Sequence, residues 1–355
     1  MRKNYYKYIG IYLLLLAFSA NAQDIHFSQY NQSPLELNPA LAGLNNCDYR
    51  VGANARTQWN TVSASNNTYT TVGAFGDLAI GKVTKFNSYA GLGLSLNTDI
   101  AGALGLNTSK ATLNFAYHFM LDKKGTSNIS AGLQLGVNYR GLNTKNATFD
   151  SQYDPNGSVY DPTKPGETFA RNNMLYLDAG LGLLYNKYFG RDHNLFFGLA
   201  ATHVNQPGIS FYQTGLFNMK APSNSKAEKL FTKITFHGGG SFLLKDNLWI
   251  NPTFMLLFQG NSKQLNFGAL VKAKVGNAKM SQTYFYGGAH FRALYADAII
   301  LHLRLEHKGF GIGFSYDVNT SKLYASSLAF GGPELSLIYT GCMKGKQKPF
   351  FCPQL

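Results

Sequence analysis

The side chains that could carry out chemistry are few and scattered along this sequence. The eight histidines do not recur at the spacings of a metal site; they are His26, His118, His193, His203, His237, His290, His302 and His307. His302 and Glu306 fall on one face of an expected strand, but the sequence around them offers no further ligand. No nucleophile elbow, P-loop or zinc motif is present. We therefore expect a protein that is not an enzyme and that has no cofactor and no metal site.

The three cysteines, Cys47, Cys342 and Cys352, are candidates for a disulfide, which an exported chain can form. A bond between Cys342 and Cys352 would close a short loop and leave Cys47 free. Pairing of Cys47 with either of the others remains open, because spacing alone does not decide connectivity. The loop between Cys342 and Cys352 is basic and is either a solvated tail or a partner contact through Lys344, Lys346 and Lys348.

The N-terminus has the three parts of a secretory signal peptide. Arg2, Lys3 and Lys7 form a basic region, and residues 9–18 form a short apolar run. Ala20-Asn21-Ala22 is a small-x-small cleavage site. We expect the mature chain to begin near Gln23 and to act beyond the inner membrane.

The composition points to a membrane β-barrel. Charged residues make up 14% of the 355 residues, against roughly 25% in ordinary soluble domains. Aromatic residues also make up 14%, there are 37 glycines, and no later segment approaches the ~20 apolar residues of a membrane helix. A barrel with an apolar face toward lipid and a polar face toward its lumen has this composition. The net charge of +14 fits acidic lipid head groups or acidic partners, and its sign alone chooses neither.

Apolar and polar residues alternate with period two through most of the chain, which predicts strands with one apolar face. In residues 110–121, Leu113, Phe115 and Phe119 alternate with Asn114 and His118. The same phasing places a set of mainly basic side chains toward the lumen, namely His118, Arg140, His237, Lys272, Lys274, His302, Arg304 and Glu306.

About fourteen such runs are present, and most are as long as the 9–11 residues that a tilted membrane strand needs. They span 49–57, 68–80, 88–97, 105–121, 127–141, 172–188, 192–205, 229–244, 247–259, 262–276, 282–291, 295–307, 309–318 and 325–339. An even number closes an up-and-down antiparallel barrel with both termini in the periplasm. The longest gaps, 142–171 and 206–228, then become extracellular loops, and the turns at the other end stay short.

The chain thus divides into a signal peptide (1–22), an N-terminal segment (23–48), a barrel (49–340) and a basic periplasmic tail (341–355). The N-terminal segment is not strand-like. Its apolar residues predict packing against the lumen as a plug, or contact with a partner through Phe27, Tyr30, Leu35 and Leu37.

Three blocks of sequence resemble the PorP/SprF family of outer-membrane proteins of the Bacteroidetes type IX secretion system. The first is Phe27-Ser28-Gln29-Tyr30 with residues 34–43, and the second is residues 49–59. The third includes Phe291-Arg292, residues 311–323 and residues 334–337, with Cys352-Pro353 at the end of the chain. In order, these blocks bracket nearly the whole mature chain.

The resemblance implies a role in protein secretion. Members of the PorP/SprF family are associated with surface display of large proteins such as gliding adhesins. They are paired with cargo that carries a type B C-terminal domain. The implied partners are such a cargo protein, periplasmic ring or motor components of gliding motility and secretion, and outer-membrane lipid, with no nucleic acid. The alternative is a channel or transporter for small or hydrophobic solutes, which barrels of this size can also form.

Overall fold

A computed structural model describes residues 24–58, 69–82, 88–102, 104–143, 148–154, 159–161, 163–164, 166, 169, 171–190, 192–212, 217–218, 229–276, 282–294, 298–320 and 330–343. Helices in this part of the chain are short, and none has the length and apolar character needed to span a membrane. The predicted signal peptide, Lys344, Lys346, Lys348 and Cys352 lie outside the described residues.

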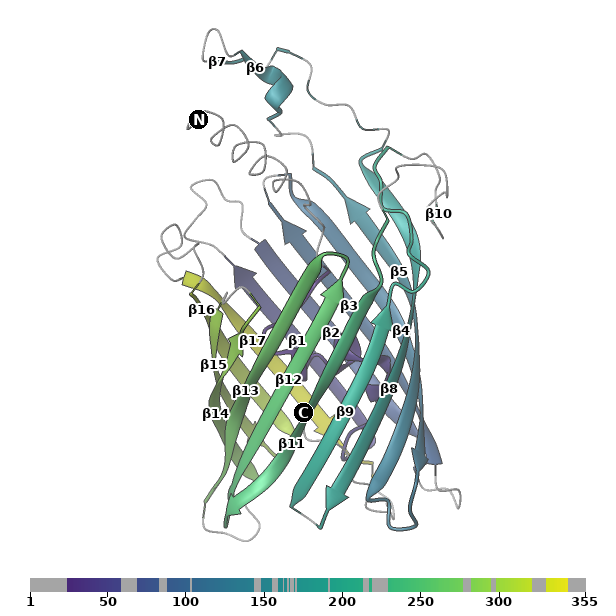
Figure 1. Ribbon diagram of the computed structural model, residues 1–355, viewed down its shortest axis with the longest axis vertical. Helices are drawn as coiled ribbons and strands as arrows, with labels where there is room; N and C mark the ends of the chain where they lie inside the picture. The colour runs from purple at the N-terminus through teal and green to yellow at the C-terminus, as the bar shows by residue number, and fades with distance from the viewer. Residues whose placement is uncertain are drawn as a thin grey trace, which may run out of the picture.

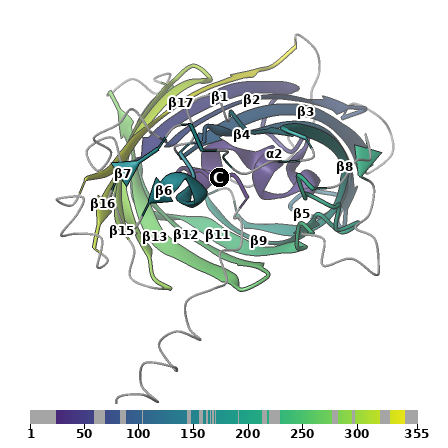
Figure 2. The same ribbon diagram turned by 90° about the horizontal axis from the view of Figure 1, so that it is seen from above.

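Fourteen antiparallel strands of the described chain close into a barrel (Figures 1 and 2). They are β1 (Tyr49–Gln58), β2 (Tyr69–Ile80), β3 (Ser88–Ala101), β4 (Leu106–Met120), β5 (Ser127–Gly141), β8 (Asn173–Phe189), β9 (His193–Thr202), β11 (Lys233–Lys245), β12 (Leu248–Gln259), β13 (Ser262–Val275), β14 (Thr283–Arg292), β15 (Ala298–His307), β16 (Phe310–Asn319) and β17 (Phe330–Gly341). Each strand pairs with its neighbours in sequence, and β17 pairs with β1 to close the ring.

All fourteen predicted strands are confirmed, with ends that shift by up to four residues within the described chain; predicted strand residues 295–297 and 325–329 lie outside it. The seventh ends at Thr202, because His203 has a φ of 57° and interrupts the regular strand pairing, although Val204 N still donates to Ala179 O of β8. The third runs on to Ala101, where it still pairs with β4.

The predicted alternation sorts side chains between lipid and lumen. On β4, Leu113 and Phe115 are 50% and 47% exposed, whereas Asn114 and His118 are fully buried. In a closed barrel the outward row is apolar and meets lipid. The inward row is polar and must find hydrogen bonds inside the lumen.

The two ends of the barrel differ, and we name them by their connections. At the turn rim, β8 is joined to β9 and β11 to β12 by residues 190–192 and 246–247. At the loop rim, residues 142–172 and 203–232 connect the strands and contain the short elements η3 (Asp150–Gln152), β6 (Tyr153–Asp154), β7 (Val159–Tyr160) and β10 (Phe217–Asn218) (Figure 1). The predicted division into long loops and short turns is thus observed for these connections.

Residues 24–48 lie inside the barrel, and we call them the plug (Figure 2). The plug contains three short helical turns, η1 (Tyr30–Gln32), α2 (Pro34–Leu37) and η2 (Pro39–Leu41). Pro34 and Pro39 each occupy the first position of a turn, where the missing N–H costs no hydrogen bond. The Asn38 side chain accepts a hydrogen bond from Ala40 N at 2.9 Å and so caps η2.

Candidate functional site

The plug contacts the barrel wall directly at positions where a strand carries a glycine. A Cβ atom at Gly91 would lie 1.9 Å from Ala42 O, and one at Gly132 would lie 2.2 Å from Ala40 N. These glycines belong to β3 and β5. Their missing side chains let the backbone of the plug approach the backbone of the strands, as expected of glycines inside strands.

Two of the predicted lumen histidines hold the same part of the plug. His118 Nε2 lies 2.9 Å from Ala42 O, which can only accept, so this nitrogen donates. His237 Nε2 lies 3.0 Å from Asn38 Nδ2, an amide that donates, so this nitrogen accepts. Both side chains are buried. Their role in the structure is therefore to satisfy polar atoms of the plug, as a dry interior requires.

The first of three charged clusters clamps the end of the plug that lies toward the turn rim. Arg50 Nε and Nη2 each lie 3.0 Å from an oxygen of Asp77, which is a bidentate ion pair. Asp77 Oδ2 also accepts a hydrogen bond from Gly43 N at 2.7 Å, and Arg50 Nη2 donates to Leu41 O at 3.3 Å. One acid and one base from β1 and β2 thus bind the plug backbone together.

The second cluster, which we call the seam cluster, fixes Ser28 and Gln29 of the plug to β17. Glu334 accepts from the backbone N–H groups of Ser28 and Gln29 at 2.7 and 3.0 Å. Gln29 Nε2 in turn donates to Glu334 O at 3.0 Å, and Ser336 Oγ donates to Gln29 Oε1 at 2.8 Å. The plug therefore pairs with β17 through both main-chain and side-chain groups.

Two arginines complete the seam cluster. Asp317 Oδ2 lies 2.8 Å from Arg56 Nη2 and 3.1 Å from Arg292 Nη2, and it also accepts from Ser28 Oγ at 2.9 Å. The side chains of Arg56 and Asp317 are 1% and 2% exposed. Counting Glu334, two acids face two bases, so the cluster is buried without net charge.

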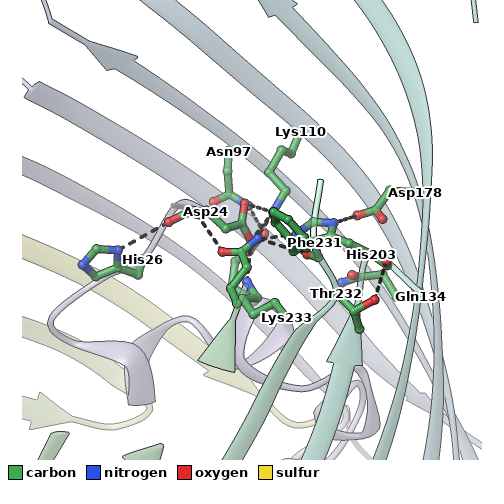
Figure 3. A network of polar contacts seen from close by, with 12 residues as sticks. Asp24, His26, Asn97, Lys110, Gln134, Asp178, His203, Phe231, Thr232 and Lys233 are labelled. Carbon is green, nitrogen blue, oxygen red and sulfur yellow. Dashed lines mark hydrogen bonds and ion pairs between the residues drawn. The ribbon is translucent and has the colours of Figure 1, made fainter. Parts of the chain in front are cut away.

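The third cluster surrounds Asp24 toward the loop rim (Figure 3). Lys110 Nζ and Lys233 Nζ lie 2.9 and 2.5 Å from the two Asp24 oxygens, and His203 Nε2 lies 3.2 Å away. The other ring nitrogen of His203 faces Asp178 at 2.8 Å, the arrangement of a protonated imidazole between two carboxylates. With Glu36, which lies 3.6 Å from Lys110, three acids face three bases.

The cations of this third cluster control the ionisation of Asp24. Burial alone would raise the pKa of the Asp24 carboxyl, but Lys110, Lys233 and His203 hold that pKa well below its usual range. Asp24 N also donates to Gln259 Oε1 at 3.1 Å, at the end of β12 on the loop rim. The plug thus begins inside the barrel near the loop rim and leads down to β1, which starts at the turn rim.

The four apolar plug residues proposed as partner contacts face the barrel instead. Phe27, Tyr30, Leu35 and Leu37 are at most 6% exposed. Leu35 packs against Gly93, and Tyr30 donates to Thr253 Oγ1 at 2.9 Å while its ring meets the His290 ring edge-on. Of the two alternatives given for these side chains, packing against the lumen wall is the one observed in this structure.

Of the cysteine pairings that the sequence left open, the structure forms Cys47–Cys342, so the candidate bond between Cys342 and Cys352 is not made. The pairing follows from register: Tyr49 is opposite Gly341 where β1 meets β17. Cys47 and Cys342 therefore flank that pair, and their Cα atoms are 4.5 Å apart. Lys82 donates to the backbone oxygens of Asn45 and Cys47 beside the bond.

The other predicted lumen residues lie on inward rows, away from the three clusters. Arg140 lies over the Phe211 ring at 5.8 Å, near the loop rim. His302 meets the His290 ring edge-on, with ring centres 4.8 Å apart. The remaining four gather near the turn rim, where Lys272 and Lys274 lie on β13 and Arg304 and Glu306 on β15.

Sequence reasoning missed the acids and bases that hold the plug. Asp24, Arg56, Asp77, Asp317 and Glu334 are all buried or nearly so, and four of them lie on inward strand positions. Arg56, Asp317 and Glu334 stood inside the sequence blocks quoted above. The available signal was a charged residue in the polar phase of a strand, which in a barrel needs a partner of opposite charge.

The arrangement is suited to holding a segment in place, and the described residues contain no group of histidine, cysteine and acidic side chains that could bind a metal ion. Two small cavities lie beside the plug in the described part of the chain. One cavity of about 30 Å³ lies between plug residues such as Ile25 and Tyr30 and wall residues such as Lys233 and Met255. A second, of about 10 Å³, lies between Leu35 and Ser95.

Solved structures similar to this chain are outer-membrane barrels. A TodX monoaromatic hydrocarbon channel mutant has a TM-score of 0.49 at 9% identity, covering 86% of this chain and 92% of that one. A FadL homologue of Pseudomonas aeruginosa has 0.47 at 10%, and the CymD monoaromatic hydrocarbon channel 0.46 at 11%, each covering 88% and 93%. At these values the comparison carries no argument about function. No curated protein has a significantly similar sequence.

The family comparison is specific. The model of the type IX secretion system membrane protein family PorP/SprF matches residues 19–339, which includes the plug and nearly the whole barrel. The match spans all three sequence blocks, and the structure brings members of each block together around Ser28, Arg56 and Asp317. This chain therefore belongs to the PorP/SprF family of type IX secretion system membrane proteins.

Proposed function

We propose that this outer-membrane barrel holds a secreted cell-surface protein during type IX secretion and does not conduct solutes. The observation that carries the proposal is the plug, which is bound to twelve of the fourteen strands of the wall. Its hydrogen bonds and glycine contacts reach β1–β5, β8, β9, β11, β12, β14, β16 and β17. A transporter needs an open or gated path, whereas an anchor can be filled.

The filled lumen leaves the two rims as the places where partners can meet the barrel. In the proposed orientation the loop rim is extracellular, and its long connections contact a cargo that carries a type B C-terminal domain, such as a gliding adhesin. The turn rim is periplasmic and faces the ring or motor components. Membership of the family and the uneven length of the connections support this orientation.

Two measurements test the proposal. In a strain that lacks the gene, we expect the partnered adhesin to be lost from the cell surface or shed into the medium, and the wild-type gene to restore it. Unchanged surface display would overturn the anchor role.

The second measurement separates the anchor from the channel. Purified protein in planar bilayers or liposomes should neither conduct ions nor admit monoaromatic hydrocarbons, because buried ion pairs hold the plug in place. Steady conductance or solute uptake by the wild-type protein would favour the channel alternative.

A further inference from the structure

A second set of inward-facing charges lies between the plug and the turn rim, on β12 to β15. Strand register arranges it in two adjacent rows. In the first row Trp249 is opposite Lys272, Lys272 opposite Tyr286, and Tyr286 opposite Arg304. In the second row Lys274 is opposite Tyr284, and Tyr284 opposite Glu306. We call these seven residues the ladder.

The ladder is tightly built from cations and aromatic rings. Lys272 Nζ lies 4.5 Å from the centre of the Tyr284 ring and 5.3 Å from that of Trp249. The Arg304 guanidinium lies 5.0 Å from the Tyr286 ring, and Tyr286 OH donates to Glu306 Oε2 at 2.9 Å. Cation–π contacts of this kind hold a positive charge in place without neutralising it.

The ladder differs from the plug clusters in its balance of charge. Each plug cluster contains equal numbers of acids and bases. The ladder contains three cations, Lys272, Lys274 and Arg304, and one acid, Glu306, whose Oε2 lies 3.4 Å from Arg304 Nη2. Its side chains therefore leave a net positive charge of two on one side of the lumen.

Two side chains of the ladder are more exposed than those of the seam cluster, in which Arg292 is the most exposed at 10%. The side chains of Arg304 and Glu306 are 16% and 28% exposed, against 1% each for Arg56 and Glu334. Trp249, Lys274 and Tyr284 are also half-buried. The plug contacts β12 and β17 farther from the turn rim, at Thr253 and Glu334.

We propose that the ladder is a binding site for an acidic peptide segment of a partner protein that enters from the turn rim. Carboxylates of the segment pair with Lys274 and Arg304, while its apolar groups lie on Trp249 and Tyr284. Charge complementarity selects this occupant. The site goes beyond the proposed function, which places cargo at the opposite rim.

The test measures binding of a labelled probe to full-length mature protein in neutral detergent. The probe is a synthetic octapeptide of alternating glutamate and leucine, and the reference peptide has glutamine in place of glutamate. We expect the acidic probe to bind at least about tenfold more tightly than the reference, and its affinity to fall as salt is raised. Equal affinity for both peptides would overturn the proposal.

Matched variants locate the binding. The double variant Lys274→Gln/Arg304→Gln should weaken probe binding by about tenfold or more. Lys123→Gln/Lys124→Gln removes the same charge from an exposed turn on the opposite wall and should leave binding unchanged. An equal loss in both double variants would show attraction to overall charge alone and would also overturn the proposal.

A spectroscopic readout shows whether the probe reaches the ladder in a folded barrel. The chain has two tryptophans, Trp59 and Trp249, so in a Trp59→Phe background all tryptophan emission comes from the ladder. Probe binding should shift that emission, and excess inorganic phosphate should not reproduce the shift. Binding without any change in Trp249 emission would place the peptide elsewhere, whereas an equal response to phosphate would show a site for small anions.

Discussion

The seam cluster and the ladder occupy the same side of the lumen, yet they handle charge in opposite ways. In the seam cluster Asp317 and Glu334 match Arg56 and Arg292, and no side chain is more than 10% exposed. In the ladder three cations share one acid and remain in contact with water. A buried charge must be paired because its desolvation is costly, whereas a hydrated charge is stable without a protein partner and remains available to a ligand. The comparison separates residues that hold this protein together from residues that can bind something else.

The largest expected effect comes from unbalancing the seam cluster. Asp317→Asn leaves the buried guanidinium groups of Arg56 and Arg292 with only Glu334 as a counter-charge. We expect the free energy of unfolding to fall by about 3 kcal/mol or more, as when one partner of a buried ion pair is removed. Urea unfolding followed by tryptophan fluorescence measures it.

A matched control for this variant is Asp192→Asn, which neutralises an exposed aspartate in the β8–β9 turn. Its stability should remain within about 0.5 kcal/mol of the wild type. If the two variants were equally stable, the seam cluster would not hold the plug.

The glycine contacts test the other wall of the lumen, which binds the plug by shape. Gly132→Val places a branched side chain where a Cβ atom would already lie 2.2 Å from Ala40 N. We expect a loss of about 2 kcal/mol, the usual cost of overpacking, together with faster proteolysis of the plug. Gly287→Ala is the control, because its Cβ would meet its nearest neighbour, Phe285, at 3.4 Å. If Gly132→Val were as stable and as resistant to proteolysis as the wild type, the plug would not rest on this wall.

A smaller effect should appear in the pH dependence of stability, through His26 of the plug. Burial and the guanidinium groups of Arg56 and Arg292 lower the pKa of His26 to about 3. In the unfolded chain His26 binds a proton with the ordinary pKa of about 6.5. The contribution of neutral His26 to the stability of the fold is therefore complete above pH 6.5 and is lost as the pH falls toward 3. Between pH 6.5 and 5.5 we expect a loss of about 1 kcal/mol.

The variant His26→Gln isolates this contribution, because the other histidines remain in both proteins. The stability of wild type should decline more steeply than that of His26→Gln as the pH is lowered, and the difference between the two curves is the His26 term. His307→Gln, an exposed histidine at the turn rim, should keep the wild-type slope. Parallel curves for wild type and His26→Gln would contradict the lowered pKa.

The fourteen strands were predictable because period-two alternation is a local signal that is repeated over each strand. The docking of the plug was not, because it depends on closure of the ring. Ser28 meets Glu334, which lies 306 positions away in the chain, only when β17 pairs with β1. The Cys47–Cys342 bond depends on that same register, which the spacing of the three cysteines could not supply. The local pattern therefore predicts whether a side chain points toward the lipid or the lumen. Which residue it contacts depends on the pairing of strands that are distant in the sequence.

The smallest expected effect is that of removing one ladder cation, and it is the most direct test of the difference between the ladder and the seam cluster. Lys274→Gln removes one of three ladder cations from a half-buried position near the turn rim. Because Lys272 and Arg304 repel it and Glu306 already contacts Arg304, the free energy of unfolding should change by less than about 0.5 kcal/mol. At low salt the variant should be slightly more stable than the wild type. Screening is weaker there, so the repulsion that the substitution removes is stronger. A loss above about 1 kcal/mol would instead mean that Lys274 completes a structural ion pair, and the ladder would then belong with the plug clusters.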